Sequence, residues 1–138
     1  MERTGDAPVR LFVYGSLRRG EENEMASLLH RHARWLGAGT IQARLYAISW
    51  YSGAVASDDP ADAVHGDAFE LDPASAGEVI ARLDAYEGAD FARRAVEVRV
   101  SETRVDAHAY LYAASVAGLP WIAHGDWLRR AAESGEVR

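Results

Sequence analysis

The order in which strand-type and helix-type patterns follow one another is the feature that most restricts the fold of this chain. Segments with alternating or continuous apolar residues follow each other in pairs, and single helix-type segments separate these pairs. The order along the chain is strand, helix, two strands, helix, two strands, helix. Many adjacent strands with few helices indicate an α+β fold, whose sheet can curl into a small barrel.

The first strand and the first helix are expected near the N-terminus. Residues 9–14 are apolar on both faces, which is typical of a central strand that is covered on both sides. Apolar side chains at helical spacing predict a helix over residues 22–34, with acidic residues at the positive end of its dipole. We expect Gly37 and Gly39 to end this unit.

The middle of the chain is expected to contain two strands and the start of a second helix. Alternating apolar residues predict a strand over residues 41–46, and the aromatic stretch 50–53 is expected to be a loop. A polar turn then leads to a strand over residues 64–71. Asp72 and Pro73 predict a helix start, because an acidic cap followed by proline suits the first helical turn.

The last third of the chain predicts two strands and a final helix. Gly88 is expected to cap the end of the second helix. Alternating valines predict a strand over residues 96–100, and a second strand is expected over 104–113. Asp126 is expected to cap the start of a helix over 127–134.

Composition limits the class of protein and its partners. The 138 residues suit a flexible leader over residues 1–8 and a single domain over 9–138. A net charge of −6 disfavours nucleic acid and anionic membranes as partners, since both require a basic face. The chain has no cysteine, which excludes disulfides, thiolate nucleophiles and zinc–thiolate sites.

The sequence contains no pattern for a membrane span or a signal peptide. No apolar run approaches the roughly 20 residues that a membrane-spanning helix requires. The first ten residues lack the apolar centre of a signal peptide. We therefore expect a cytoplasmic protein.

Glu87 is the carboxylate with the clearest indication of a chemical role. It follows Leu83 by four residues and Ile80 by seven, so the three side chains share the apolar face of a helix. Burial and the negative end of the helix dipole both disfavour the anion and raise its pKa, which suits general acid–base catalysis. If the helix ends one residue earlier, Glu87 is instead an exposed cap residue. Asp84 and Asp90 are expected to be solvated surface acids.

The segment YGSLRRG, residues 14–20, has two interpretations. It is either a tight turn between a strand and a helix, or a loop whose backbone N–H groups bind a carboxylate or phosphate. It is not a nucleotide phosphate loop, because the Gly-Lys-Ser/Thr core is absent. Ser16 is not the nucleophile of a hydrolase elbow, because the flanking pair of glycines is missing.

Histidine and arginine residues give weaker indications. His30 and His32 diverge on a helix, so we expect no metal site, and nothing in the sequence implies a cofactor. The tripeptide His-Gly-Asp occurs at 65–67 and at 124–126, which we interpret mostly as chance and turn chemistry. The arginine pairs are expected on solvated faces or beside acidic partners; they lie at 18–19, 93–94 and 129–130.

Two segments taken together, FVYGSLRRG and LDAYEG, resemble the gamma-glutamylcyclotransferase-like (AIG2-like) family. The segments VHGDAFEL, FARRAVEV, AYLYAA and GDW are similar to further parts of that family, so the resemblance covers roughly residues 11–127. It implies a small mixed β-barrel flanked by helices. The family includes many bacterial members.

The resemblance also implies the roles of particular residues. Glu87 would be the catalytic acid–base. The loop that would bind the α-carboxylate and amine of a γ-glutamyl substrate, largely through backbone groups, consists of Tyr14, Gly15, Ser16 and Leu17. The expected pocket wall consists of Trp50, Tyr51, Phe91 and Tyr112.

Two positions depart from the family pattern. Ser52 stands where many members have proline, and Phe91 stands where many have tyrosine. Both substitutions are expected to change the pocket wall, and with it the preference for the amine that leaves.

The implied reaction converts a γ-glutamyl amine or peptide to 5-oxoproline and releases the free amine, in the lyase or acyltransferase class. The only expected partner is this small-molecule substrate, bound by a monomer or a homodimer. Two alternatives stay open. One is a non-catalytic small-ligand-binding or interaction module on the same scaffold, and the other is a γ-glutamyl amide hydrolase or acyl transferase.

Overall fold

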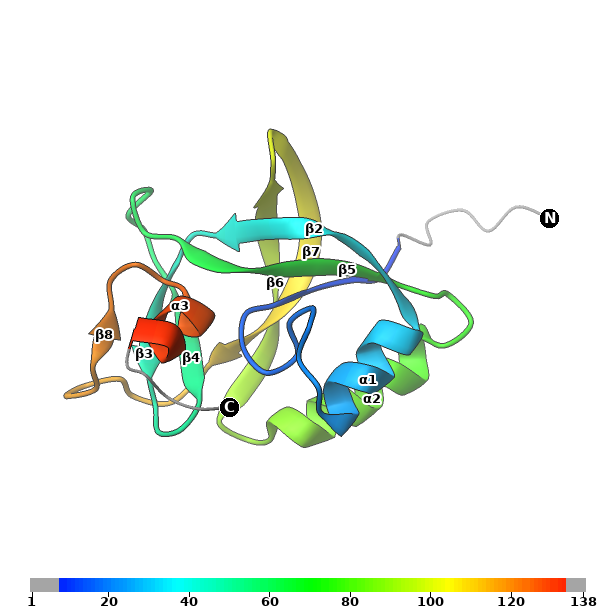
Figure 1. Cartoon of the computed structure of the whole chain (residues 1–138), viewed down its shortest axis with the longest axis horizontal. Helices are drawn as coiled ribbons and strands as arrows, with labels where there is room; N and C mark the ends of the chain where they lie inside the picture. Colours follow the sequence, from blue (N-terminus) through cyan, green and yellow to red (C-terminus); the bar gives the residue numbers. More distant parts are fainter. Residues whose placement is uncertain (1–7, 134–138) are drawn as a thin grey trace.

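A closed barrel dominates the computed structural model, which describes residues 8–133; residues 1–7 of the expected leader and residues 134–138 lie outside the described part. Within residues 8–133, five strands form the barrel in the order β1-β5-β2-β6-β7 (Figure 1). They are β1 (Arg10–Val13), β2 (Ala33–Ile41), β5 (Val64–Leu71), β6 (Phe91–Val100) and β7 (Thr103–Tyr112). β1 runs parallel to β7, and the other neighbours are antiparallel, so the barrel is mixed.

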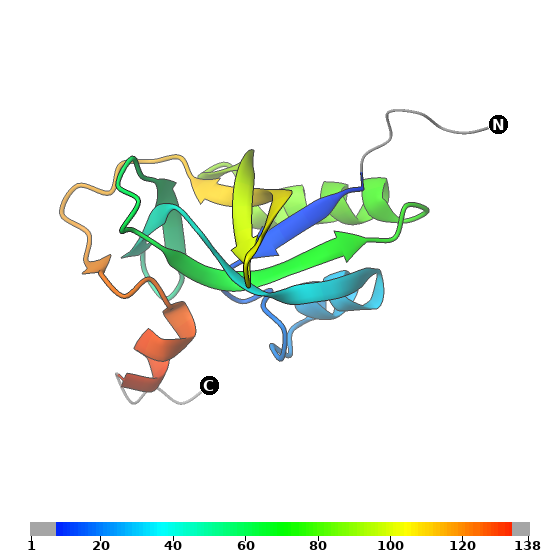
Figure 2. The same ribbon diagram turned by 90° about the horizontal axis from the view of Figure 1, so that it is seen from above.

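A small sheet and helices flank the barrel. The sheet has the order β4-β3-β8, formed by β3 (Ala43–Ala47), β4 (Ser52–Ala56) and β8 (Trp121–Ile122). The helices are α1 (Glu24–Arg31), α2 (Ala76–Glu87) and α3 (Trp127–Glu133). α1 and α2 pack side by side beneath the barrel, whereas α3 lies near the small sheet at the other end (Figures 1 and 2). The expected α+β fold with a helix-flanked mixed barrel is confirmed.

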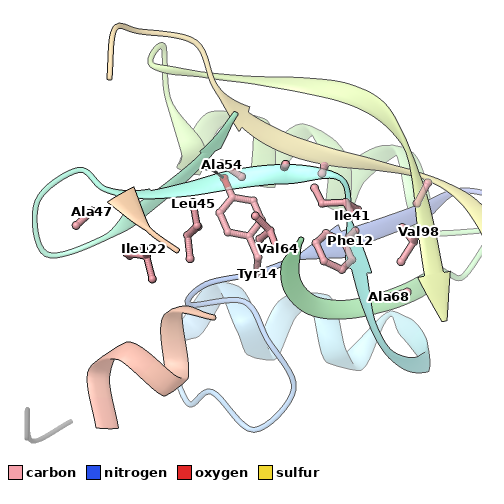
Figure 3. Close-up of a cluster of buried hydrophobic side chains, with 13 residues drawn as sticks. Phe12, Tyr14, Ile41, Leu45, Ala47, Ala54, Val64, Ala68, Val98 and Ile122 are labelled. Carbon is pink, nitrogen blue, oxygen red and sulfur yellow. Dashed lines mark hydrogen bonds between the residues drawn. The ribbon is translucent and has the colours of Figure 1, made fainter. Parts of the chain in front are cut away.

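β1 is apolar on both faces because it separates two cores. Phe12 points into the barrel, where the apolar cluster also contains Ile41, Leu45, Val64 and Val98 (Figure 3). Leu11 and Val13 point the other way and pack with the apolar side chains of α1 and α2, including Leu29, Val79 and Leu83. The prediction of a covered central strand is confirmed, since β1 pairs with β5 on one side and β7 on the other.

The helix boundaries correct two expectations. The helix predicted over 22–34 covers only Glu24–Arg31, because Ala33 already pairs with Leu71 in the barrel. The second helix does not begin at Pro73. The backbone N–H of Asp72 donates to the carbonyl of His32, which extends the strand ladder by one residue, and α2 begins only at Ala76.

The expected helix caps at Gly88 and Asp126 are found. Gly88 follows the last residue of α2 with φ of 82°, and its N–H donates to the carbonyl of Asp84. The carboxylate of Asp126 accepts from the N–H groups of Leu128 and Arg129 at 3.1 and 3.2 Å. Both caps satisfy backbone groups that the ends of a helix leave unpaired.

Gly37 and Gly39 lie inside β2 and do not end the preceding unit, contrary to expectation. A β-bulge occurs between Trp35 and Gly37. A Cβ atom on Gly39 would lie 2.6 Å from the carbonyl oxygen of Arg99, next to the pair Thr40–Arg99 that joins β2 to β6. These glycines therefore serve the close approach of two strands where the barrel closes.

Two other segments are more regular than expected. β4 begins at Ser52, inside the stretch 50–53 that we expect to be a loop. Ser52 pairs with Ala47, the last residue of the antiparallel strand β3. β6 begins at Phe91, five residues before the predicted strand over 96–100, since it pairs with β7 along its whole length. Among the described helices, none is long and apolar enough to cross a membrane.

Replacement of Gly39 by alanine should destabilise the protein by about 2 kcal/mol or more, because the new methyl group would displace the backbone of β6 where the barrel closes. Urea unfolding would measure the change. Gly77→Ala is the matched control. A Cβ at Gly77 meets nothing within 4 Å, and alanine favours a helix by about 0.8–1 kcal/mol over glycine, so this variant should keep or gain stability. Equal unfolding midpoints for the two variants would contradict the role of Gly39.

Candidate active site

A cavity of about 490 Å³ lies where the turn after β1, the start of β4 and the end of α2 meet. Its floor contains the buried side chains of Tyr14, Ser52 and Tyr110. Its rim carries the exposed aromatic side chains of Trp50 and Tyr86. The volume falls within the range of about 300–1,000 Å³ that is common for small-molecule sites.

The cavity brings together most of the residues expected at the site. Those that line it are Tyr14, Gly15, Ser16, Leu17, Trp50, Tyr51, Glu87 and Phe91. Tyr112 is not a lining residue. Its ring packs against Phe91 from behind, with ring centroids 5.4 Å apart, so its expected place in the wall is corrected to a second layer. The roles of the lining residues toward a substrate stay predictions.

The turn over residues 15–17 is held by its carbonyl groups, while its N–H groups are free. The side-chain amide of Asn23 donates to the carbonyl of Ser16 at 2.6 Å, and Nε2 of His30 lies 2.9 Å from the carbonyl of Leu17. Because the two sides of a trans peptide point in opposite directions, the N–H of Leu17 points away from Asn23. Within residues 8–133, the N–H groups of Gly15, Ser16 and Leu17 donate to no protein acceptor.

A buried carboxylate fixes the chain just after this turn. Asp67 on β5 is only 4% exposed and accepts from Nε of Arg18 at 3.1 Å, the N–H of Arg19 at 3.0 Å and Nε1 of Trp35 at 3.2 Å. Arg18 also contacts Asp126 at 3.3 Å. A buried charge is tolerated only with partners of this kind. Arg18 thus proves to be a partner of acids and not part of a solvated face.

The two His-Gly-Asp tripeptides meet in space. The N–H of His65 donates to the carbonyl of Gly125 at 2.8 Å, and Asp67 and Asp126 contact the same guanidinium group of Arg18. Turn chemistry accounts for the second tripeptide, where Gly125 has φ of 70° and Asp126 caps α3, whereas the first tripeptide lies in β5; the repeat also places two acids beside one arginine. The repeat contains the two acids of this contact, Asp67 and Asp126, but the sequence does not indicate that both contact Arg18, which is distant in the chain.

The hydroxyl of Tyr14 is fully used inside the protein. It donates to the carbonyl of Tyr110 at 2.6 Å and accepts from the N–H of Ala54 at 3.0 Å. Burial raises the pKa of Tyr14 above its usual range. Figure 3 shows the ring among the apolar side chains of the barrel cluster. Tyr14 therefore contributes cavity wall and support, and its hydroxyl is not available to a ligand.

Asp84 is an exposed acid, as expected, but it also has partners on the barrel. It accepts from the hydroxyl of Tyr110 at 2.7 Å and pairs with Arg93 at 2.9 Å. The Arg93 hydrogen bond is the main cause that lowers the pKa of Asp84 below its usual range. These bonds tie the last turns of α2 to β6 and β7, and so fix the end of α2 at the cavity.

Glu87 is the last residue of α2 and is half-buried in the cavity wall. Burial raises the pKa of its carboxyl from 4.5 to about 7. Among the described residues, none forms a hydrogen bond or ion pair with it. The neighbouring Tyr86 hydroxyl lies 3.4 Å from Oγ of Ser16, so the end of α2 and the turn are close together.

A family model described as "Gamma-glutamyl cyclotransferase, AIG2-like" matches residues 11–129. The chain belongs to this family. None of the curated proteins compared matches the chain. Within residues 8–133, no three His, Asp or Glu side chains lie close enough to hold a metal ion.

Solved structures agree with this assignment. The chain is 35% identical to ytfP from Escherichia coli, with a TM-score of 0.62 over 88% of this chain and 98% of that one. YkqA from Bacillus subtilis is 23% identical with a TM-score of 0.74, and the match covers 94% of this chain but only 43% of YkqA. An AIG2-like protein (A2LD1, GGACT) from Mus musculus is 23% identical with a TM-score of 0.69, over 88% and 89% of the two chains. The last two show a shared fold.

In the present chain, the two residues expected to depart from the family pattern, Ser52 and Phe91, both line the cavity. Ser52 is buried in the floor, and its Oγ would lie 3.7 Å from a Cβ on Gly15. Phe91 lies in the wall, with its ring centroid 6.2 Å from that of Tyr51. Ser52 and Phe91 are therefore part of the surface that a ligand would contact.

The variant Glu87→Gln should gain stability over the wild type as the pH rises from about 4.5 to about 7. In this range the folded wild type retains a proton that the unfolded chain loses, so stability of the wild type falls with pH. Above pH 7 the carboxyl is ionised in both the folded and the unfolded wild type, so the difference in unfolding free energy between variant and wild type should level off. We expect it to reach on the order of 2 kcal/mol, less than the full pKa shift implies because the carboxyl keeps some hydration. Urea unfolding between pH 4 and about 8 measures it, and a difference independent of pH would contradict the burial of Glu87.

Proposed function

We propose that this protein cyclises a γ-glutamyl amine or peptide to 5-oxoproline and releases the free amine, with Glu87 as general acid and base. The observation that carries the proposal is the meeting of two groups in one cavity. Glu87, whose half-buried carboxyl has a pKa raised to about 7, lines the same cavity as the turn over residues 15–17, whose N–H groups have no protein acceptor within residues 8–133.

The reaction needs no nucleophile from the protein. The α-amine nitrogen of the substrate attacks its own γ-carbonyl carbon, a new carbon–nitrogen bond closes the five-membered lactam, and the bond to the leaving amine breaks. The α-ammonium nitrogen gives up two protons to become the lactam N–H. One is transferred to the leaving nitrogen as its bond breaks, and the free amine takes up the second when it is released as an ammonium ion, so the reaction is balanced without a co-reactant. Because the attack is intramolecular, holding the substrate in a folded conformation supplies much of the rate.

Glu87 suits the transfer of the proton that reaches the leaving nitrogen as its bond breaks. At neutral pH a carboxyl with a pKa of about 7 is present in both protonation states. It can therefore accept the proton from the ammonium group and then donate it to the leaving nitrogen, which is the condition under which acid–base catalysis is most efficient. Since no hydrogen bond or ion pair within residues 8–133 engages the carboxyl of Glu87, it is free to interact with a substrate.

The turn suits the anionic part of the substrate. Successive backbone N–H groups form a concave donor site for a carboxylate, and donors fixed in advance also stabilise negative charge on a carbonyl oxygen during attack. The bonds from Asn23 and His30 fix the carbonyls of this turn, so the N–H groups of Gly15, Ser16 and Leu17 need no rearrangement before they bind.

The variant Glu87→Gln should lower the release of 5-oxoproline from a panel of γ-glutamyl compounds by about 10²–10⁴-fold, because glutamine keeps the shape but carries no titrating proton. Mass spectrometry of the products measures the release. It also separates cyclisation from hydrolysis, which would yield free glutamate. Glu78→Gln, an exposed change on the same helix, is the control and should leave activity unchanged. Equal activity of wild type and Glu87→Gln would refute the mechanism.

For the wild type, kcat/KM should rise with pH and level off above an inflection near 7. The ionised carboxylate of Glu87 is the form that accepts the first proton, and its fraction grows through the pKa of about 7. Initial rates between pH 5 and about 9 measure the profile. An ascending limb centred near 4.5 would show that the catalytic carboxyl is not buried in the way the cavity indicates.

A further inference from the structure

The cavity contains no cationic side chain. Among its lining residues, all within residues 8–133, none is arginine, lysine or histidine. The lining does include two carboxyl groups, those of Glu87 and Asp90, and Asp90 is exposed at the rim. A carboxylate on the leaving part of a substrate would therefore meet like charges and find no cation to offset them.

Aromatic rings make up much of the rest of the cavity lining. Trp50 stands at the rim with 80% of its surface exposed, and its ring contacts Tyr51 edge-on at a centroid distance of 5.1 Å. Tyr51 in turn lies 6.2 Å from Phe91, which Tyr112 supports from behind. Walls of this kind bind flat apolar groups through buried area and ring stacking.

The turn over residues 15–17 and the aromatic wall suit different parts of a substrate. The turn over residues 15–17 supplies N–H donors but carries no positive side chain into the cavity, so its donors suit the one α-carboxylate that every γ-glutamyl compound has. For a second carboxylate the aromatic wall offers only neutral donors, the hydroxyl of Tyr51 and the indole N–H of Trp50, and no cation. The cavity volume of about 490 Å³ leaves room for a ring beside the glutamyl group.

We propose, on the basis of the cyclisation proposed above, that the released amine carries an aromatic or similarly flat apolar group and no carboxylate. Trp50, Tyr51 and Phe91 hold that group. The preferred substrates are then γ-glutamyl conjugates of arylalkylamines, in contrast to γ-glutamyl amino acids and peptides that end in a carboxylate.

Three compounds test this preference directly. γ-Glutamyl-2-phenylethylamine has the ring without a carboxylate, γ-glutamylphenylalanine adds only the carboxylate, and γ-glutamylethylamine lacks only the ring. The measurement is kcat/KM for release of 5-oxoproline by the full chain. The kcat/KM for γ-glutamyl-2-phenylethylamine should exceed that for each of the other two compounds by about tenfold or more, which corresponds to about 1.4 kcal/mol or more.

Variants assign the two preferences to residues. Trp50→Ala should reduce the ratio of kcat/KM between the phenylethylamine and ethylamine compounds several-fold. Because the Trp50 side chain is exposed, its loss should not unfold the protein. Trp121→Ala is the matched control, because Trp121 is also exposed but does not line the cavity, and it should leave the ratio unchanged. Asp90→Arg should reduce the ratio of kcat/KM between the phenylethylamine and phenylalanine compounds several-fold, because it replaces a negative charge at the cavity by a positive one.

The outcomes are distinct. Turnover of the phenylalanine compound equal to that of the phenylethylamine compound would overturn the charge preference, and equal turnover of the ethylamine compound would overturn the ring preference. In both cases the cyclisation itself would stand. Turnover of other γ-glutamyl compounds of the panel but of none of these three would overturn the inference alone. Release of no 5-oxoproline from any compound of the panel would overturn the proposed function, and with it the inference that rests on it.

Discussion

The buried hydroxyl of Tyr14 joins the parts of the molecule that enclose the cavity. It donates to the carbonyl of Tyr110 on β7 and accepts from the N–H of Ala54 on β4, so one group links β1, the barrel and the small sheet. A buried polar group with both of its partners adds rigidity and specifies a single arrangement. Because Tyr14 directly precedes Gly15, this arrangement also sets where the turn begins.

Tyr110 extends this connection to the opposite wall. Its carbonyl accepts from Tyr14, and its hydroxyl donates to Asp84 near the end of α2. A single residue therefore couples the turn to the helix that carries Glu87. On the far side of the turn, Asp67 and Arg18 fix the chain again. A glycine-containing turn would otherwise lose much conformational freedom on binding, so anchors at both ends prepare it in advance.

The sequence predicted some elements well and others poorly, for identifiable reasons. Glu87 was placed on an inward helix face because helical spacing is a local property, and the structure finds it half-buried at the cavity. The expectation for Gly37 and Gly39 is wrong because glycine serves both chain turns and close strand contacts, and only their neighbours on β6, Val100 and Arg99, show that these are strand contacts. The helix start at Pro73 failed because pairing of the preceding strand with β2 extends past Leu71.

By itself, the sequence determined the element order, the family motifs and the inward face of the second helix, because these depend on residue type and short spacing. Only the tertiary structure decided that Glu87 and the turn share a cavity, since the two come together through contacts between residues about 70 positions apart. It also decided that the partly buried Arg18 lies between two acids and that Tyr112 lies behind Phe91. Closure of the barrel sets these relations, and no local pattern encodes where distant strands meet.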